Sequence, residues 1–169
     1  MTFPMDEYFL KQAIQLAFEA MELPKGGPFG AVVVYEGEII GASSNNVFTS
    51  FDPTAHAEVQ AIRDACGKHK IHFLKGCTLY SSCEPCPMCF SAIFYAKIDR
   101  VVYAASHKDA DDIAGFGVDR LYAELERPVE QRKLNHVQLL RQEGLGAFER
   151  WANSMPDKEQ FTRTIQQKK

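Results

Sequence analysis

Four side chains in this sequence have the types and spacing of a catalytic zinc site: His56 and Glu58 in His-Ala-Glu, and Cys86 and Cys89 in Pro-Cys-Pro-Met-Cys. Zinc in proteins binds imidazole nitrogen and thiolate sulfur in tetrahedral geometry, and a catalytic zinc keeps one position for water. His56, Cys86 and Cys89 satisfy that requirement, with one ion per chain. Glu58 is left over as a carboxylate that can receive a proton, so the pattern predicts a hydrolase.

The chemistry follows from the charges of these groups. Zinc lowers the pKa of a bound water from about 16 towards ~7 in favourable sites, and Glu58 can accept the released proton and pass it on. Water activated in this way suits attack on an amidine-like carbon, followed by protonation of a departing amine, which is hydrolytic deamination. The alternative is an inactive protein that keeps zinc for structure, and such a protein has no need of Glu58.

Both groups of ligands are expected at the first turns of helices. Cys86 and Cys89 are i and i+3 on one helical turn, so both thiols can face one point. His56 and Glu58 need not point in the same direction, so one can reach the metal while the other reaches the water. A helix N-terminus also lowers the pKa of a thiol placed there, which favours the Cys86 thiolate.

Apolar periodicity and the positions of Gly and Pro divide the chain into alternating elements. Helices are predicted at 6–22, 55–66, 86–96, 120–126 and 146–153, strands at 29–35, 38–44, 78–82, 100–105 and 136–140, and polar loops at 45–54 and 106–117. Glu36-Gly37 is a candidate for a tight turn, which makes the first two strands a hairpin. Strand–helix alternation after residue 55 indicates an α/β layered domain with at least one parallel pair, and the hairpin makes its sheet mixed.

Composition sets outer limits on the class of protein. The 169 residues are 46% apolar and 24% charged, which fits one soluble domain, expected at 1–155, followed by a polar arm or tail at 156–169. The net charge of −3 and the pI of about 6.0 show no basic excess of the kind that nucleic-acid surfaces carry. No apolar run approaches the ~20 residues that span a bilayer. An acidic N-terminus unlike a secretory signal, and an odd number of cysteines, favour a reducing, cytoplasmic location.

The segments around the zinc residues narrow the class further. The most specific are Gly26–Val32, Asn45–Val47, Asp52–Val59, Ser82–Cys89 and Ala114–Phe116. On these segments the chain resembles the cytidine and deoxycytidylate deaminase superfamily, and within it the bacterial guanine deaminase group and its nucleoside-deaminase relatives. The resemblance runs from about Phe9 to Phe161. His-x-Glu with Pro-Cys-x-x-Cys is the signature of zinc-dependent deaminases of nucleobases.

The resemblance implies a fold and a set of roles. The fold is a three-layer α/β/α sandwich around a mixed five-stranded sheet, with zinc on the His and two Cys and the proton shuttle on the Glu. The residues expected to contact substrate are Asn45, Phe29, Ala57, Asp119 and Phe161. Asn45 suits the recognition of a base because its amide offers both a donor and an acceptor. The resemblance also implies a homodimer, with 156–161 a candidate for crossing between subunits.

The chain departs from the group in two places. Guanine deaminases usually follow Gly-Phe with two aspartates, one of which recognises the purine, whereas Gly115-Phe116 is followed here by Gly117-Val118. Either Asp119 takes over that contact through a shifted loop, or the contact is missing. The second departure is Phe161, which matches an aromatic residue that closes over the base but lacks a tyrosine hydroxyl.

Several substrates are compatible with this pattern. Guanine, converted to xanthine and ammonia, is the leading one, and cytosine, an aminotriazine or guanosine carries a similar amidine. A tRNA adenosine deaminase is the alternative that acts on a macromolecule. Phosphate neutralisation by Lys and Arg dominates affinity for RNA, and 19 basic residues against 22 acidic ones favour a small-molecule partner.

Overall fold

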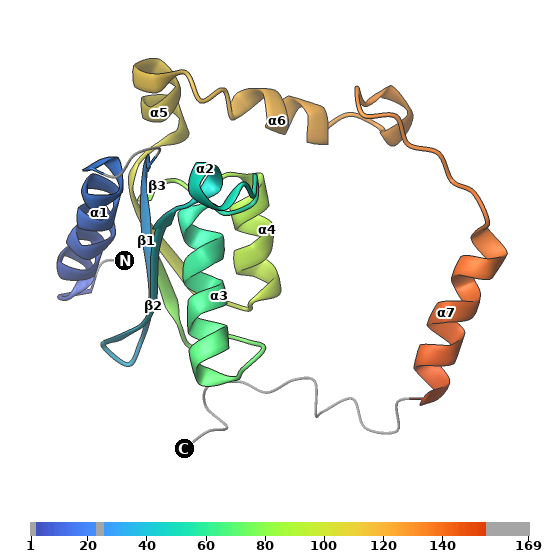
Figure 1. Cartoon of the computed structure of the whole chain (residues 1–169), viewed down its shortest axis with the longest axis horizontal. Helices are drawn as coiled ribbons and strands as arrows, with labels where there is room; N and C mark the ends of the chain where they lie inside the picture. Colours follow the sequence, from blue (N-terminus) through green and yellow to red (C-terminus); the bar gives the residue numbers. More distant parts are fainter. Residues whose placement is uncertain (1–2, 23–25, 155–169) are drawn as a thin grey trace.

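The computed structural model describes residues 3–22 and 26–154, and Figure 1 shows the arrangement of its elements. The elements in chain order are α1 (Asp6–Glu22), β1 (Gly27–Tyr35), β2 (Glu38–Asn45), α2 (Val47–Ser50), α3 (Ala57–His69), β3 (Thr78–Cys83), α4 (Pro87–Tyr95), β4 (Arg100–Ala105), α5 (His107–Ala114), α6 (Asp119–Leu125), the 3₁₀ turn η1 (Val129–Gln131) and α7 (Arg141–Ser154). In the described part of the chain, none of these helices is long and apolar enough to cross a membrane.

The sheet is mixed, as the sequence predicts, but it has four strands in the order β2-β1-β3-β4. Strand β1 runs antiparallel to β2 and β3, and β3 runs parallel to β4. The β1–β2 hairpin turns at Glu36 and Gly37, whose φ values of 47° and 83° are those of a tight turn that matches strand twist. The crossover through α4 between β3 and β4 makes the parallel pair.

The expected fifth strand at 136–140 is wrong, because that segment has no regular structure and pairs with no strand of the described chain. Its alternating apolar residues fit a strand pattern, but a strand also needs a neighbour that exchanges backbone hydrogen bonds with it. Val137 and Leu139 are 69% and 78% exposed instead. The described sheet therefore ends at β4.

Helices cover both faces of the sheet (Figure 1). Ala31 and Val33 of β1 face the larger core under α3 and α4, while Val32 and Val34 face Phe9 and its neighbours in α1. This alternation is the period of two expected for a strand that is buried on both faces. The three-layer arrangement predicted for the domain is therefore present in residues 6–105.

The segment 106–117, predicted to be a loop, contains helix α5. The Ser106 hydroxyl accepts the backbone N–H of Asp109, and the Asp109 carboxylate accepts the backbone N–H of Ser106. This reciprocal cap satisfies two donors at the helix start and stabilises it. The spacing Ser-x-x-Asp was the available signal for this helix.

The chain beyond α5 forms an extended arm, defined here as residues 119–154. The helices predicted at 120–126 and 146–153 are confirmed as α6 and α7, but neither contains a buried residue. Figure 1 shows α7 standing apart from the sheet and its covering helices. The predicted tail at 156–169, including Phe161, lies outside the described residues, so the boundary at 155 stays a prediction.

A buried ion pair fixes the start of α1 to the sheet. The Arg100 guanidinium of β4 donates to both carboxylate oxygens of Asp6 at 2.7 and 2.6 Å, and the Tyr80 hydroxyl donates to one of them at 2.8 Å. Asp6 is only 6% exposed. The hydrogen bond from Arg100 holds the pKa of the Asp6 carboxyl well below its usual range.

We expect Asp6→Ala to lower the free energy of unfolding by about 3 kcal/mol near neutral pH, because it removes the buried carboxylate that accepts hydrogen bonds from Arg100 and Tyr80. The folded-state pKa of Asp6 lies below the unfolded value near ~4, so this contribution is full above about pH 4 and is lost as the pH falls further. Urea unfolding of both proteins at several pH values measures it. Glu7→Gln, an exposed neighbour paired with Lys11, is the control. A difference between wild type and Asp6→Ala that stays constant through the acid range would contradict the assignment.

Candidate active site

Two helix starts bring the zinc residues together. His56 is the N-cap of α3 and Cys86 is the N-cap of α4, and both have extended backbone dihedrals. Pro87 at the first position of α4 has the φ that a helix start needs and lacks an N–H that would go unpaired. The turn before α3 is fixed by Asp52, whose carboxylate accepts the Thr54 N–H at 2.8 Å. The side chains at both helix starts therefore have defined positions.

The ligand atoms are spaced as a tetrahedral zinc requires. His56 Nδ1 lies 3.6 Å from Cys86 Sγ and 3.4 Å from Cys89 Sγ. The three ligand atoms all lie within 4.8 Å of one another. Atoms bound to one zinc at about 2.3 Å (sulfur) and about 2.0 Å (nitrogen) are about 3.5 Å apart at a tetrahedral angle. The donor set and its spacing thus fit zinc with one coordination position left open.

The local electrostatics favour a thiolate at Cys86. The hydrogen bond from the Cys89 thiol lowers the pKa of Cys86 to about 4, and the contact with His56 acts in the same direction. The hydrogen bond between the two cysteines raises the pKa of the Cys89 thiol. The contact with Cys86 also raises the pKa of His56. The neighbouring thiol is therefore the largest cause, and the backbone N–H of Cys89 in the first turn of α4 lowers the pKa of Cys86 as well, as the sequence suggested.

Glu58 lies beside the ligands in the first turn of α3. Its side chain is 6% exposed, and its Oε2 lies 3.4 Å from Cys89 Sγ while its Oε1 accepts from the Ser81 hydroxyl at 3.4 Å. Burial raises the pKa of this carboxyl above its ordinary value. A carboxyl that is held next to the metal ligands and readily takes up a proton is suited to proton transfer.

A pocket of about 280 Å³ opens onto these residues. Its lining includes Asn45 and Phe29, which the sequence singled out, together with His56, Glu58 and Cys86. The other lining residues are Val47, Phe48, Cys83, Glu84, His107, Ala110, Phe116 and Val118. Of these, the sequence assigned no role in the pocket to Phe48, Glu84, His107 or Ala110. The pocket is therefore formed by five segments, at 29, 45–48, 56–58, 83–86 and 107–118.

Two aromatic rings form one wall of this pocket. The Phe29 ring meets the Phe116 ring edge to face, with centroids 4.9 Å apart. Asn45 lies beside them at the end of β2, and its Oδ1 is buried without a hydrogen-bond partner. This combination of an apolar wall and an unsatisfied amide suits a flat, polar ring.

The remaining predicted contacts lie elsewhere. Ala57 is fully buried in the core under α3, and Asp119 is exposed at the start of α6. Neither is among the residues that line the pocket. Their roles in substrate binding stay predictions.

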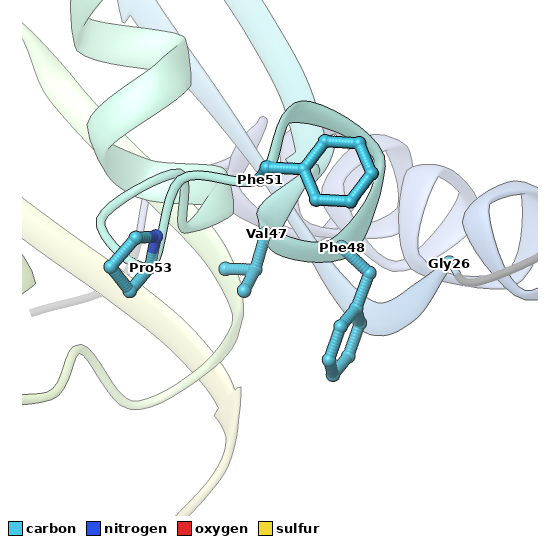
Figure 2. Close-up of a pocket in the computed structure, with 5 residues that line it drawn as sticks. All are labelled: Gly26, Val47, Phe48, Phe51 and Pro53. Carbon is cyan, nitrogen blue, oxygen red and sulfur yellow. The ribbon is translucent and has the colours of Figure 1, made fainter.

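A second, apolar hollow adjoins the first. Gly26, Val47, Phe48, Phe51 and Pro53 line about 590 Å³, and Val47 and Phe48 also line the first pocket. Figure 2 shows that these side chains come mainly from α2 and the turn that follows it. Phe48 is 61% exposed and Phe51 is 86% exposed, so the mouth of the candidate active site carries an uncovered apolar surface.

Comparison with protein families identifies the domain. Residues 4–105 match the family described as the cytidine and deoxycytidylate deaminase zinc-binding region. The match spans the sheet, both helix starts and all four zinc-site residues. The chain belongs to the cytidine and deoxycytidylate deaminase family.

Two relatives of this deaminase are informative. It is 49% identical over 153 residues to the guanine deaminase of Bacillus subtilis, which covers 90% of this chain and 97% of that protein. The X-ray structure of that enzyme superposes with a TM-score of 0.85, covering 90% of this chain and 96% of that chain. The tRNA-specific adenosine deaminase of Aquifex aeolicus is 47% identical over 103 residues, or 60% of this chain and 67% of that protein.

In this deaminase the loop after Phe116 is organised without an aspartate in the pocket. The Asp111 carboxylate accepts the backbone N–H of Gly117, and that of Val118 at 3.4 Å. Val118 lines the pocket, while Asp119 points into the solvent-exposed start of α6. The described loop therefore presents an apolar side chain, Val118, at the position where the resemblance predicts an acid.

Proposed function

We propose that this deaminase is a zinc-dependent aminohydrolase that converts guanine and water to xanthine and ammonia. The observation that carries the proposal is the 49% identity to a guanine deaminase, which extends over 153 residues and so through most of the arm as well as the core. Similarity to the tRNA deaminase of Aquifex aeolicus is confined to 103 residues. The net charge of −3 also favours a small substrate over RNA.

We assign the metal to His56, Cys86 and Cys89, one zinc per chain. When bound, zinc lowers the pKa of water so that water can attack at neutral pH. Glu58 takes one proton from that water and delivers it to the ring nitrogen next to the attacked carbon. It then takes the second proton from the hydroxyl that has added to this carbon and passes it to the amine, so that the C–N bond breaks, a C=O forms and ammonia leaves. Asn45 orients the base through its amide, and the Phe29–Phe116 wall holds the plane of the ring and excludes water.

A substrate panel tests the proposal. Purified protein is offered guanine, guanosine, cytosine, cytidine, adenosine, an aminotriazine and a tRNA anticodon stem, with ammonia measured. We expect guanine to be turned over with the highest kcat/KM. Turnover of the tRNA stem alone would overturn the free-base assignment, and a preference for cytosine or the aminotriazine would move the substrate while leaving the reaction unchanged.

Gly27→Ala is expected to raise KM for guanine about tenfold, because it displaces Asn45. A Cβ at Gly27 would lie 2.3 Å from Asn45 Nδ2. The amide end of Asn45 can move away from this contact, so the backbone of the strand does not have to shift. The expected change in Tm is therefore small. Gly67→Ala, where a Cβ meets nothing within 4 Å, is the control. Unchanged guanine kinetics in Gly27→Ala would remove Asn45 from the recognition of the base.

We also propose that the enzyme is a homodimer in which the arm of one subunit covers the other. A single helix of 14 residues is marginally stable in water, so α7 needs a packing partner. Phe148 and Trp151 on α7 are 74% and 51% exposed. The exposed Phe48 and Phe51 at the active-site mouth of a second copy offer an apolar surface of matching character.

Light scattering on the full chain tests the dimer. We expect twice the monomer mass for wild type and a shift to monomer for the double variant Phe148→Ala and Trp151→Ala. A monomeric wild type would end this proposal without affecting the substrate assignment.

With guanine as the substrate, the enzyme would act in purine metabolism. Its five free cysteines support a reducing, cytoplasmic location.

A further inference from the structure

A buried histidine outside the metal cluster faces the active-site pocket with an unused nitrogen. His107 is the first residue of α5 and is 8% exposed, and it lines the same pocket as Glu58. Its Nε2 is buried and has no hydrogen-bond partner. Among residues 3–22 and 26–154, the other buried side-chain atom in that condition is Asn45 Oδ1. Because unsatisfied buried polar atoms are costly, two in one pocket indicate a ligand that pairs with both.

Glu84 fixes the orientation of this imidazole. Glu84 Oε2 accepts the backbone N–H of His107 at 3.1 Å and lies 3.5 Å from His107 Nδ1. The Glu84 backbone N–H in turn donates to the Ala105 carbonyl at 2.8 Å, which joins the ends of β3 and β4. On its other side the imidazole packs on the Tyr122 ring, with centroids 5.7 Å apart. The ring is therefore contacted by two side chains from other parts of the chain, Glu84 and Tyr122.

The carboxylate determines which nitrogen carries the proton. A carboxylate that faces Nδ1 favours the tautomer protonated there, so the neutral imidazole presents a lone pair at Nε2. His107 Nε2 is then a hydrogen-bond acceptor without a partner, on a residue that lines the pocket. Asn45 Oδ1 is an acceptor as well. Two such acceptors select a ligand with at least two N–H donors.

Among the described residues that line the pocket, His107 Nε2 and Asn45 Oδ1 are the buried side-chain atoms without a hydrogen-bond partner. Val118 occupies the loop position where an acid is expected, and the Asp111 carboxylate is engaged by backbone N–H groups. The two acids that line the pocket are Glu58, assigned to proton transfer, and Glu84, engaged by His107. His107 Nε2 is therefore our candidate for the acceptor of a ring N–H on this side of the pocket.

We propose that His107, oriented by Glu84, reads the purine by accepting a ring N–H at Nε2, in place of the aspartate that the loop lacks. This inference rests on the proposed function, since it assigns the acceptor for that substrate. Guanine carries ring N–H groups on both of its rings besides its amino group, and so can satisfy His107 and Asn45 together. Glu84 acts as a positioning residue and does not touch the substrate.

His107→Ala tests the proposal, with His72→Ala, an exposed histidine in the loop before β3, as the matched control. We expect kcat/KM for guanine to fall about ten- to a hundredfold in His107→Ala, mainly through KM, with zinc content unchanged. His107→Gln keeps an acceptor and is expected to recover part of the loss. Glu84→Gln is expected to give a smaller loss than His107→Ala. A kcat/KM within twofold of wild type for His107→Ala would overturn the assignment.

Methylated substrates distinguish recognition of the base by His107 from a purely structural role of this residue. 1-, 7- and 9-methylguanine each lack one ring N–H. When the missing N–H is the one that His107 accepts, we expect kcat/KM to fall by a larger factor in wild type than in His107→Ala. Equal relative losses for all three analogues in both proteins would overturn the inference. If wild type fails to deaminate guanine, the proposed function fails instead, and the same comparison is made on the substrate that the panel identifies.

Discussion

Glu58→Gln is expected to lower kcat for ammonia release by about a hundred- to ten-thousandfold, with zinc content equal to that of wild type. Glutamine has nearly the same shape as glutamate but cannot accept a proton from water or return it to the leaving amine. Glu58 is buried at 6% exposure, and its Oε2 lies 3.4 Å from Cys89 Sγ, so the carboxyl is in direct contact with the ligand cluster. Steady-state ammonia release and metal analysis on the same sample measure the two quantities.

The control separates proton transfer from a change of charge. Glu38→Gln removes an exposed carboxylate at the start of β2, and its kcat is expected to match wild type. If Glu58→Gln also released ammonia at the wild-type rate, the proton-shuttle mechanism would be wrong. If wild type itself released none from any substrate, the inactive zinc-binding alternative would stand.

The convergence of His56, Cys86 and Cys89 was predictable because the spacing within each pair of side chains is local. His56 and Glu58 lie within one turn of α3, and Cys86 and Cys89 lie within one turn of α4, so the spacing alone determines which side chains can converge. What spacing cannot give is the contact between the two helices. That contact depends on β3, which places α4 beside α3, and it decides the 3.4 Å approach of Cys89 to His56.

Most of the sheet was predictable for the same reason, whereas its edge was not. The hairpin at Glu36-Gly37 follows from turn residues, and the strands of 78–83 and 100–105 follow from short apolar runs. Residues 136–140 have a strand pattern without a neighbour to pair with, and only the tertiary arrangement reveals that. The helix at 107–114 was missed because its acids suggest a solvated loop, although Ser106 and Asp109 form a cap.

The lining of the pocket was the least predictable part. His107 follows β4 as Glu84 follows β3, and these strands are parallel with Cys83 opposite Ala105. Because the carboxyl ends of parallel neighbours meet at one edge of a sheet, both side chains arrive together there. The pairing of β3 with β4 was the signal that could have placed His107 in the pocket. Asp119, one residue beyond Val118, is the first residue of α6 and is exposed to solvent.

Cys86→Ala is expected to reduce bound zinc from about one ion per chain to a small fraction after dialysis against a weak chelator, and to abolish ammonia release. Two ligands remain, and loss of a thiolate removes both a bond and the charge that balances the metal. The apparent Tm is expected to fall as well, since zinc stabilises only the folded chain that assembles its ligands. Metal analysis, activity and thermal unfolding measure the three effects.

Cys86 is the better ligand to replace because it separates metal binding from packing. Cys89 is fully buried against α3, so its removal would also leave a cavity in the core, whereas Cys86 is partly exposed at the helix N-cap. Cys66→Ala, a thiol on α3 away from the ligand cluster, is the control and is expected to keep its zinc. Stoichiometric zinc in Cys86→Ala would remove Cys86 from the ligand set. The open position would then have to be reassigned, because His56 and Cys89 alone leave two sites free.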